Sequence, residues 1–417
     1  MEYGLIGEHL SHSFSAEIHG KIRDYRYELK ELKPEEVDGF MKEKNFRAIN
    51  VTIPYKRTVI PYLSYIDPAA RKIGAVNTVV NRNGELYGYN TDYSGMRELI
   101  SSAGIDVSGK EVLILGSGGT SRTAYAVAES LDASGIYRVS RTGKDGCITY
   151  EEAKKNHGDA RIIINTTPCG MYPNIGTAAV DIDDFPALSG VIDAVYNPLR
   201  TALVQKALDK GIPASGGLYM LVAQAVYAAE YFTGEPVEKG TTERIFREML
   251  SNKENVVLIG MPGCGKSTVG KYLSSLRNMK VIDTDALIVQ KEGKEITQIF
   301  AEVGESGFRD IESEVIREVS SLQHVIISTG GGSILRPENV ALLKENGKTC
   351  FLDCPLSILK ATDSRPLSNT QDKLRQRFEE RYDKYCACAD IRIECTDNFM
   401  DNAVMTGKEI ENAYSGN

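Results

Sequence analysis

The chain has 417 residues, of which 42% are hydrophobic and 25% charged, and this ordinary globular composition excludes a disordered or fibrous protein. The 49 basic and 57 acidic residues give a formal net charge of −8, without the basic tail or stripe that marks a nucleic-acid binder. No run approaches the ~18 consecutive apolar residues of a membrane helix. We expect two to four domains, at roughly 100–200 residues each, and neither nucleic acid nor membrane as a partner.

The first seven residues, MEYGLIG, form a strand-like run without a basic leader or cleavage motif. The eight cysteines are scattered, and none forms a C-x-x-C pair. Cys386 and Cys388 lie two apart, but neither a second pair nor a nearby histidine completes a metal set. We therefore expect reduced thiols and a cytoplasmic location. The sequence leaves the oligomeric state open.

Three glycine-rich turns each follow a short apolar run. The runs are residues 112–115, 256–259 and 325–328, and the turns begin at Gly116, Gly260 and Gly330. Strand, glycine turn and helix in succession predict parallel α/β layers, in which ligands bind at the carboxyl ends of the strands.

A polar stretch, residues 251–254 (SNKE), precedes the second glycine turn. Just before it, residues 241–250 have the apolar spacing of an amphipathic helix. We predict a solvated break there and place the main domain boundary in it.

The first glycine turn is similar to a dinucleotide-binding fingerprint, although Ser121 stands at its third position. A plain tight turn explains such a pattern about as often. The next strand, residues 136–139, ends in an arginine between two hydroxyl residues, which suits the 2′-phosphate of NADP better than the ribose of NAD. The predicted cofactor residues are Gly116, Ser117, Gly118, Gly119, Thr120, Ser140, Arg141 and Thr142.

Four polar clusters stand at the ends of apolar or strand-like runs. They are residues 11–15 (SHSFS), 50–56 (NVTIPYK), 74–78 (GAVNT) and 90–92 (NTD). Each alone is typical of a cap or turn. Together they offer hydroxyls, amides, one lysine and one aspartate, which suit a small polyhydroxylated acid.

These clusters, with residues 115–122 (LGSGGTSR), 164–173 (INTTPCGMYP) and 218–225 (LYMLVAQA), resemble the shikimate dehydrogenase family in the same order. The resemblance implies a substrate-binding domain over residues 1–92, completed by helices within 216–250, and a Rossmann NADP-binding domain over 93–215. It implies reduction of 3-dehydroshikimate to shikimate.

The resemblance also assigns roles to individual residues. Lys56 and Asp92 match the catalytic pair, in which an ammonium stabilises the developing alkoxide and supplies its proton while a carboxylate orients it. The residues that match substrate contacts are Ser13, Ser15, Thr52, Asn77, Tyr196 and Gln224. Those that border the nicotinamide are Ala194 and Gly217, together with residues 165–168 and Met220.

One departure from the family concerns the cofactor. A second arginine often follows the Asn-Arg-Thr motif three residues later, and this chain has Lys144 and Asp145 in that region. We expect a softer preference for NADP over NAD.

The second glycine turn fulfils the P-loop spacing after a strand. In such a loop the backbone N–H groups cradle phosphates, Lys266 reaches the β- and γ-phosphates, and the Ser267 hydroxyl ligates Mg²⁺. The sequence therefore predicts ATP and Mg²⁺ binding. The predicted nucleotide-binding residues are Gly263, Cys264, Gly265, Lys266, Ser267 and Thr268.

The rest of this part resembles shikimate kinase. The shared motifs, in family order, are residues 283–285 (DTD), 307–309 (GFR) with Glu312, 330–332 (GGG), 365–367 (RPL) and 380–382 (ERY). The resemblance implies a P-loop kinase domain over residues 255–417, with a parallel sheet, that phosphorylates shikimate to shikimate 3-phosphate.

By this resemblance Asp285 is the catalytic carboxylate at the acceptor hydroxyl, and Asp283 lies near Mg²⁺. Arg309 and Arg381 would clamp the substrate carboxylate, for which the planar guanidinium is suited. Taken alone, Arg309 and Glu312 are more typical of a helix-surface salt bridge. The triple glycine would let the backbone approach the ring, with Gly331 nearest. Arg365 would offset phosphate charge from a mobile lid, and Lys360 stands where the family has an arginine against the adenine.

The sequence therefore predicts an α/β bifunctional enzyme of the shikimate pathway. Two alternatives stay open. One is a quinate/shikimate dehydrogenase fused to a kinase of another polyol acid, and the other is a catalytically silent sensor of pathway intermediates.

Overall fold

The computed structural model describes residues 1–10, 13–359 and 370–415, which form two compact units. The first unit comprises Met1–Met171, Thr177–Tyr196 and Leu203–Glu248. The second comprises Met249–Asn417 together with two short segments from earlier in the chain, Tyr172–Gly176 and Asn197–Ala202. None of the helices in the described ranges is long and apolar enough to cross a membrane.

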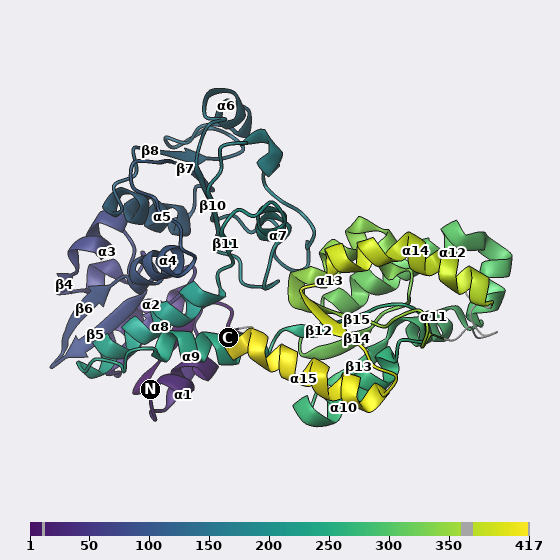
Figure 1. Ribbon diagram of the computed structural model, residues 1–417. Helices are drawn as coiled ribbons and strands as arrows, with labels where there is room; N and C mark the ends of the chain where they lie inside the picture. Colours follow the sequence, from purple (N-terminus) through teal and green to yellow (C-terminus); the bar gives the residue numbers. More distant parts are fainter. Residues whose placement is uncertain (11–12, 360–369, 416–417) are drawn as a thin grey trace. The chain divides into compact units, whose positions relative to one another are not determined.

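The first unit begins with a mixed six-stranded sheet in the order β2-β1-β3-β5-β6-β4. Figure 1 labels three of its strands, β4, β5 and β6. β1 is buried along its whole length because it pairs in parallel with β2 on one side and β3 on the other. The strands are β1 (Tyr3–Gly7), β2 (Tyr27–Glu31), β3 (Ala48–Val51), β4 (Tyr65–Ile66), β5 (Thr78–Arg82) and β6 (Glu85–Tyr89). The helices in this part of the sequence are α1 (Ser15–Ile22), α2 (Pro34–Glu43), the 3₁₀ turn η1 (Ile60–Tyr62) and α3 (Pro68–Ile73).

The same unit contains a second sheet that is parallel throughout, in the order β11-β10-β9-β7-β8. Its strands are β7 (Glu111–Leu115), β8 (Gly135–Val139), β9 (Ile162–Asn165), β10 (Gly190–Asp193) and β11 (Ala214–Ser215). The intervening helices are α5 (Gly119–Ser130), α6 (Tyr150–Asn156), η2 (Ile182–Asp184) and α7 (Ala202–Asp209).

Two helices tie these sheets together, namely α4 (Thr91–Ser102) and α8 (Leu218–Thr233), which pack against each other. Met96 of α4 and Ala223 of α8 belong to the core on the second sheet, whereas Phe232 packs with Tyr3 on the first. α8 therefore contacts both sheets. The helix α9 (Thr241–Ser251) follows it.

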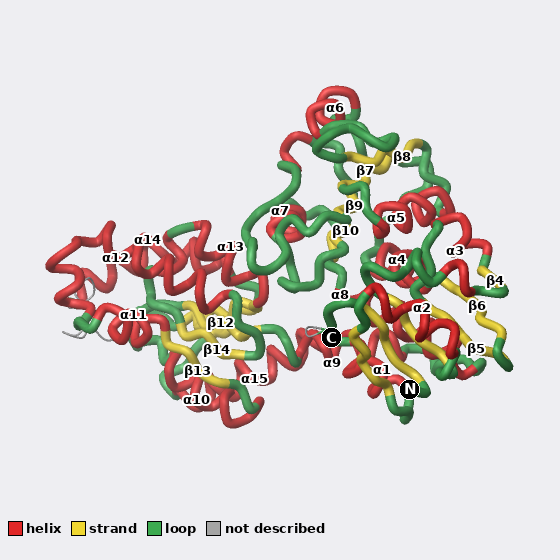
Figure 2. The backbone as a smooth tube through the Cα atoms, turned by 180° about the vertical axis from the view of Figure 1, so that it is seen from behind, coloured by secondary structure: helices red, strands yellow, loops and turns green. Residues whose placement is uncertain are grey.

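The second unit has one parallel sheet in the order β13-β14-β12-β15-β16. Figure 2 shows α10 and α15 on one side of these strands and α12, α13 and α14 on the other. The strands are β12 (Asn255–Ile259), β13 (Lys280–Asp283), β14 (Val325–Ser328), β15 (Gly347–Asp353) and β16 (Ile391–Glu394). The helices are α10 (Lys266–Arg277), α11 (Thr284–Glu292), α12 (Ile296–Ser320), η3 (Ser333–Leu335), α13 (Pro337–Asn346), α14 (Gln371–Cys388) and α15 (Phe399–Ser415).

The expected strands before the three glycine turns are present as β7, β12 and β14, and the amphipathic helix before the boundary is α9. The predicted solvated break at residues 251–254 is wrong in one respect. Glu254 is fully buried, because it directly precedes β12 at the centre of the sheet and finds cationic partners there.

Candidate active sites

A cavity of about 420 Å³ lies in the first unit at the carboxyl ends of β1, β3 and β10. It collects the predicted catalytic pair and all six predicted substrate residues. Of the residues predicted to contact the cofactor it includes Thr120, Ala194, Gly217 and Met220. Its lining also contains residues that the sequence did not single out as contacts, namely Leu5, His9, Leu10, Asn50, Val51, Ile53 and Leu221.

Lys56 and Asp92 form an ion pair in this cavity, with 2.6 Å between Nζ and Oδ2. Lys56 lies in the turn after β3, and Asp92 lies in the first turn of α4, which Asn90 caps by accepting a hydrogen bond from the Tyr93 N–H. The positive end of the helix favours a carboxylate at this position. The two side chains keep 27% and 19% of their surface exposed, so the pair is accessible from the cavity.

Amide and hydroxyl groups on three elements hold the neighbouring wall in place. Asn77 accepts from the Thr91 N–H at 2.7 Å and donates to Thr91 Oγ1 at 3.1 Å. The Thr91 hydroxyl in turn donates to Gln224 Oε1 on α8 at 3.4 Å. This chain of hydrogen bonds fixes the orientation of two predicted substrate contacts before any ligand binds.

Asn50 lines the cavity and makes several hydrogen bonds, although the sequence analysis assigned it no role of its own. Its Oδ1 accepts from the Tyr27 hydroxyl at 2.8 Å and lies 3.1 Å from His19 Nε2, while its Nδ2 donates to Thr78 Oγ1 at 3.1 Å. Burial lowers the pKa of His19 to about 3, so the ring is neutral and donates through Nε2. The position of Asn50 in the NVTIPYK cluster was a usable signal, whereas nothing in the sequence marked His19.

The glycines on the cofactor side fall into two groups. A Cβ on Gly116, whose φ is +121°, would lie 2.6 Å from Thr166 Oγ1, and one on Gly217 would lie 2.3 Å from the Ala194 carbonyl oxygen. These glycines are required by the protein itself. Gly118 and Gly119, by contrast, have no neighbour within 4 Å of a Cβ among the described residues.

The space at Gly118 and Gly119 lies at the start of α5, whose first N–H groups lack helical partners. Such a helix start accommodates a pyrophosphate, and the exposed Arg141 follows β8. The residues therefore fit a phosphorylated dinucleotide. The predicted cofactor residues Gly116, Ser117, Gly118, Gly119, Ser140, Arg141 and Thr142 do not line the 420 Å³ cavity itself.

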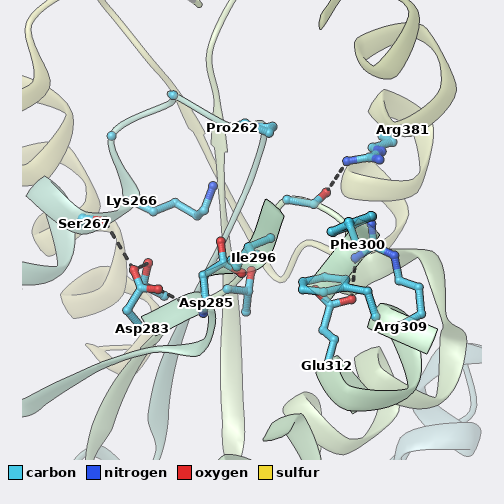
Figure 3. A pocket seen from close by; sticks show the side chains of 18 of the residues that line it. Pro262, Lys266, Ser267, Asp283, Asp285, Ile296, Phe300, Arg309, Glu312 and Arg381 are labelled. Carbon is cyan, nitrogen blue, oxygen red and sulfur yellow. Dashed lines mark hydrogen bonds and ion pairs between the residues drawn. The ribbon is translucent and has the colours of Figure 1, made fainter. Parts of the chain in front are cut away.

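A second cavity, of about 460 Å³, lies in the second unit between the P-loop and α12 (Figure 3). It contains the predicted P-loop residues except Cys264, both aspartates of the DTD motif, the triple glycine and the two predicted arginines. The apolar part of the lining, which the sequence analysis did not predict, is Pro262, Ile296, Phe300 and Phe308.

Lys266, at the start of α10, donates to two carbonyl oxygens of its own loop, Gly260 at 2.8 Å and Met261 at 3.1 Å. Ser267 Oγ lies 3.5 Å from Asp283 Oδ2, and the other oxygen of Asp283 caps α11 by accepting from the Asp285 N–H at 3.1 Å. A hydroxyl and a carboxylate are hard oxygen ligands that suit Mg²⁺. The described residues contain no group of three His, Cys, Asp or Glu side chains that could hold a metal. This agrees with the usual coordination of Mg²⁺ at such sites, where few protein ligands are joined by waters and substrate phosphates.

Arg309 and Arg381 are buried at the opposite side of this cavity, with 8% and 2% of their surface exposed. Arg309 Nη1 donates to Glu312 Oε2 at 2.6 Å, and Arg381 Nη1 donates to the Gly331 carbonyl at 2.9 Å. Arg309 Nε and Arg381 Nε and Nη2 are buried without a hydrogen-bond partner. Burial lowers the pKa of Arg381, and the charge of Arg309 adds to the effect. Unsatisfied donors on two neighbouring buried cations call for an anionic ligand.

The triple glycine is explained by close approaches of the site's own side chains. A Cβ on Gly332 would lie 2.2 Å from the Arg309 guanidinium, and one on Gly330 would lie 2.6 Å from Asp285 Oδ1. Gly331 accepts hydrogen bonds from Arg381 and the Tyr385 hydroxyl. These glycines therefore leave room for the charged groups of the cavity.

Three further predicted residues are not part of the cavity lining that the structure describes. The Cys264 side chain is fully buried and does not line the cavity, and the Cys354 thiol donates to its carbonyl at 3.4 Å. The Cys264 thiol is therefore not placed to bind phosphate, and the backbone N–H of this residue donates to the Met261 carbonyl at 3.2 Å. Arg365, together with Lys360, lies outside the described residues.

A mixed sheet and a Rossmann-type sheet around a Lys–Asp pair define a dinucleotide-linked dehydrogenase, and a parallel sheet with a P-loop cavity defines a nucleotide-dependent kinase. The family models agree with this division. Residues 5–79 match the shikimate dehydrogenase substrate binding domain, and residues 262–407 match shikimate kinase. The chain belongs to the shikimate dehydrogenase family and carries a shikimate kinase domain.

Individual relatives match the first part of the chain. The shikimate dehydrogenase (NADP(+)) of Clostridium perfringens (strain SM101 / Type A) is 39% identical over 274 residues, which are 59% of this chain and 97% of the relative. The crystal structure of shikimate dehydrogenase 1 from Peptoclostridium difficile is 36% identical with a TM-score of 0.54, covering 60% of this chain and 98% of that one. Shikimate 5-dehydrogenase from Thermus thermophilus, solved with NADP(H) and shikimate, is 28% identical with a TM-score of 0.54. The match covers 60% of this chain and 99% of that one. The predicted family resemblance and fold class are thereby confirmed.

Proposed function

We propose that the first unit reduces 3-dehydroshikimate to shikimate with NADPH and that the second transfers the γ-phosphoryl group of ATP to shikimate, giving shikimate 3-phosphate. The observation that carries this proposal is common to both cavities. Each cavity combines an acid–base group with donors suited to a carboxylated polyol. The acid–base group is the Lys56–Asp92 pair in the first cavity and Asp285 in the second. The first cavity supplies hydroxyls and amides, and the second supplies two arginines.

In the reduction, bound NADPH supplies the hydride that adds to the carbonyl carbon. The Lys56 ammonium donates a hydrogen bond to the carbonyl oxygen, stabilises the negative charge that develops there and gives up a proton to form the hydroxyl. Asp92, 2.6 Å from Nζ, orients the ammonium. The Ser13 and Ser15 hydroxyls hold the substrate carboxylate without a buried counter-charge.

The dinucleotide is NADP in this proposal, and two observations support it. The exposed Arg141 between two hydroxyl residues suits a 2′-phosphate. The names of the Clostridium perfringens relative and of the Thermus thermophilus structure specify NADP(+) and NADP(H).

In the phosphorylation, bound ATP supplies the phosphoryl group. Lys266 would exchange the loop carbonyls for phosphate oxygens, and Ser267 with Asp283 would hold Mg²⁺, which would offset the negative charge of the phosphates. Asp285 accepts the proton of the attacking hydroxyl. Arg309 and Arg381 bind the shikimate carboxylate through their unpartnered N–H groups. The two reactions are linked at one atom, because the hydroxyl formed at C3 by the first is the acceptor in the second.

A separate assay of each unit in the full chain tests the proposal. NADPH would be offered with 3-dehydroshikimate or 3-dehydroquinate, and Mg·ATP with shikimate or quinate. We expect turnover at least tenfold faster with the shikimate-series substrate in both assays. Preference for the quinate series would favour the quinate dehydrogenase alternative. Ligand binding without turnover in either assay would favour a sensor.

We also propose a cytoplasmic location, in keeping with the eight free cysteines.

A further inference from the structure

The second unit contains a surface that is occupied by residues from far earlier in the sequence. The segment Asn197–Ala202 follows β10, yet it belongs to the second unit. Three groups of Arg200 donate to the junction between α13 and β15. Its backbone N–H lies 2.9 Å from the Glu345 carbonyl oxygen, its Nε 3.0 Å from that of Lys344, and its Nη2 2.7 Å from that of Gly347.

These contacts satisfy the end of a helix. Lys344 and Glu345 lie in the last turn of α13, whose carbonyl groups have no partner within the helix. A cation at this end also interacts favourably with the helix dipole. Arg200 therefore acts as the C-terminal cap of α13.

The same arginine compensates a buried charge. Glu254, directly before β12, is fully buried, and its Oε1 lies 2.7 Å from Arg200 Nη2 in an ion pair that lacks hydrogen-bond alignment. Lys348 Nζ lies 3.8 Å from Oε2 of this carboxylate, and the Tyr414 hydroxyl donates to Oε2 at 2.6 Å. A carboxylate buried to this extent is strongly destabilising when its cation is removed.

Backbone and apolar contacts extend the surface on both sides of Arg200. The Leu199 N–H donates to the buried Asn346 Oδ1 at 3.0 Å, and Gln323 Nε2 donates to Asn197 Oδ1 at 3.1 Å. From the other segment, Tyr172–Gly176, the Gly176 N–H donates to Glu345 Oε1 at 2.8 Å. Ile175 of that segment packs on the core of the second unit.

We infer that the face formed by Glu254, Gln323 and residues 344–347 is a docking surface for residues 172–176 and 197–202 of the same chain. The second unit therefore folds around these segments and is incomplete as residues 249–417 alone. Tyr196, which directly precedes the docked segment, lines the first cavity. This docking does not depend on which acid the two cavities act on, and its tests rest only on nucleotide binding by the P-loop cavity.

Hydrogen exchange on the full-length protein tests this assignment. The backbone amides of Leu199 and Arg200, which donate to Asn346 Oδ1 and to the Glu345 carbonyl, should exchange at least tenfold more slowly than an exposed loop. Saturating Mg·ADP should slow them together with residues 345–350, because the amides of one cooperative unit open together. Fast exchange of the Leu199 and Arg200 amides, or protection of these amides that ignores Mg·ADP while residues 345–350 respond, would overturn the inference.

Unfolding of full-length variants gives a second, independent test. The unfolding transition of the second unit is the one whose Tm rises when Mg·ADP is added. Arg200→Ala should lower this Tm by at least about 6 °C. The matched control Arg317→Ala removes an exposed arginine of α12 and should change it by no more than about 1 °C. Adding Glu254→Gln to Arg200→Ala should recover part of the loss, because the uncompensated charge is then gone. A Tm for Arg200→Ala within about 1 °C of the parent, or no recovery in the double variant, would contradict the docking. If Arg200→Ala does not fold, hydrogen exchange on the unaltered protein decides.

Discussion

Lys56 and Asp92 are 36 positions apart in the chain, and the turn after β3 and the start of α4 bring them together. We expect Lys56→Met to lower kcat for 3-dehydroshikimate reduction by ~10²–10⁴-fold, because the proton donor and the charge facing the alkoxide are both lost. NADPH absorbance at saturating substrate measures the change. Phosphorylation of shikimate by the same variant should keep its rate.

Lys42→Met is the matched control, because Lys42 also forms a lysine–aspartate pair, with Asp38 at 2.8 Å, but on the exposed surface of α2. Its removal should leave both activities unchanged. A fall of less than tenfold in the Lys56 variant would contradict the assigned role of this lysine.

Substitution of Arg381 tests whether Arg309 and Arg381 bind the substrate carboxylate. Arg381→Lys keeps the positive charge but loses the planar fork, so the KM for shikimate should rise roughly 10- to 100-fold. The KM for ATP should change less than threefold. Initial-rate measurements with each substrate varied in turn separate the two constants.

The neighbouring Arg377→Lys provides the comparison on the same helix, since Arg377 pairs with Glu380 at a more exposed position. This variant should behave like the parent. An equal rise of both KM values in Arg381→Lys would indicate general damage to the cavity and would argue against the clamp.

At the scale of elements, a substitution in the turn between β7 and α5 should affect cofactor binding without affecting the stability of the fold. A Cβ on Gly118 meets no neighbour in the described protein, and φ of −78° is allowed for any residue. Gly118→Ala should therefore leave the Tm within about 1 °C, while the KM for NADPH rises at least tenfold as the methyl group meets the pyrophosphate. An unchanged KM for NADPH would show that the cofactor does not approach this turn.

The end of α13 predicts a pH dependence of stability. Burial raises the pKa of Glu345 to about 7, partly offset by the Gly176 N–H. The folded protein therefore keeps this proton between pH 5 and 7, whereas the unfolded chain, with an ordinary carboxyl, releases it. Stability consequently falls as pH rises through this window and stays lower above it.

Glu345→Gln removes the titration and should make the second unit more stable than the parent at pH 8 by about 1–3 kcal/mol, with little difference at pH 5. The Mg·ADP-sensitive unfolding transition, followed at both pH values, measures the effect. Glu338→Gln, at an exposed position on the same helix, should retain the pH dependence of the parent. A stability difference between the parent and the Glu345→Gln variant that is the same at pH 5 and pH 8 would contradict the assignment.

At the scale of the whole molecule, local patterns in the sequence predicted the parallel layers, the glycine turns and the residues that meet in each cavity. These features are encoded within short stretches, where hydrophobic runs and turn residues follow one another. The burial of Glu254 was missed because its partner, Arg200, is distant in sequence, and a charge next to a polar stretch ordinarily indicates solvent. The sequence also contained no sign that His19 is buried and neutral. That state depends on its packing against Asn50 and Tyr25 in the folded protein.

The roles of the glycines at residues 330–332 show the same limit. A glycine run predicts close approach, but the approaching group is set by tertiary packing, and here it includes Asp285 and Arg309 of the same cavity. The sequence thus predicted where the chemistry lies more fully than how the surrounding residues support it.

The central claim is that one chain carries out two consecutive reactions, and a single incubation tests it most directly. The purified full-length protein would be mixed with 3-dehydroshikimate, NADPH and Mg·ATP, and the products identified by mass spectrometry. The account predicts shikimate 3-phosphate, with one NADPH oxidised and one ADP formed for each molecule of product. Accumulation of unphosphorylated shikimate, or no consumption of either cofactor, would contradict it.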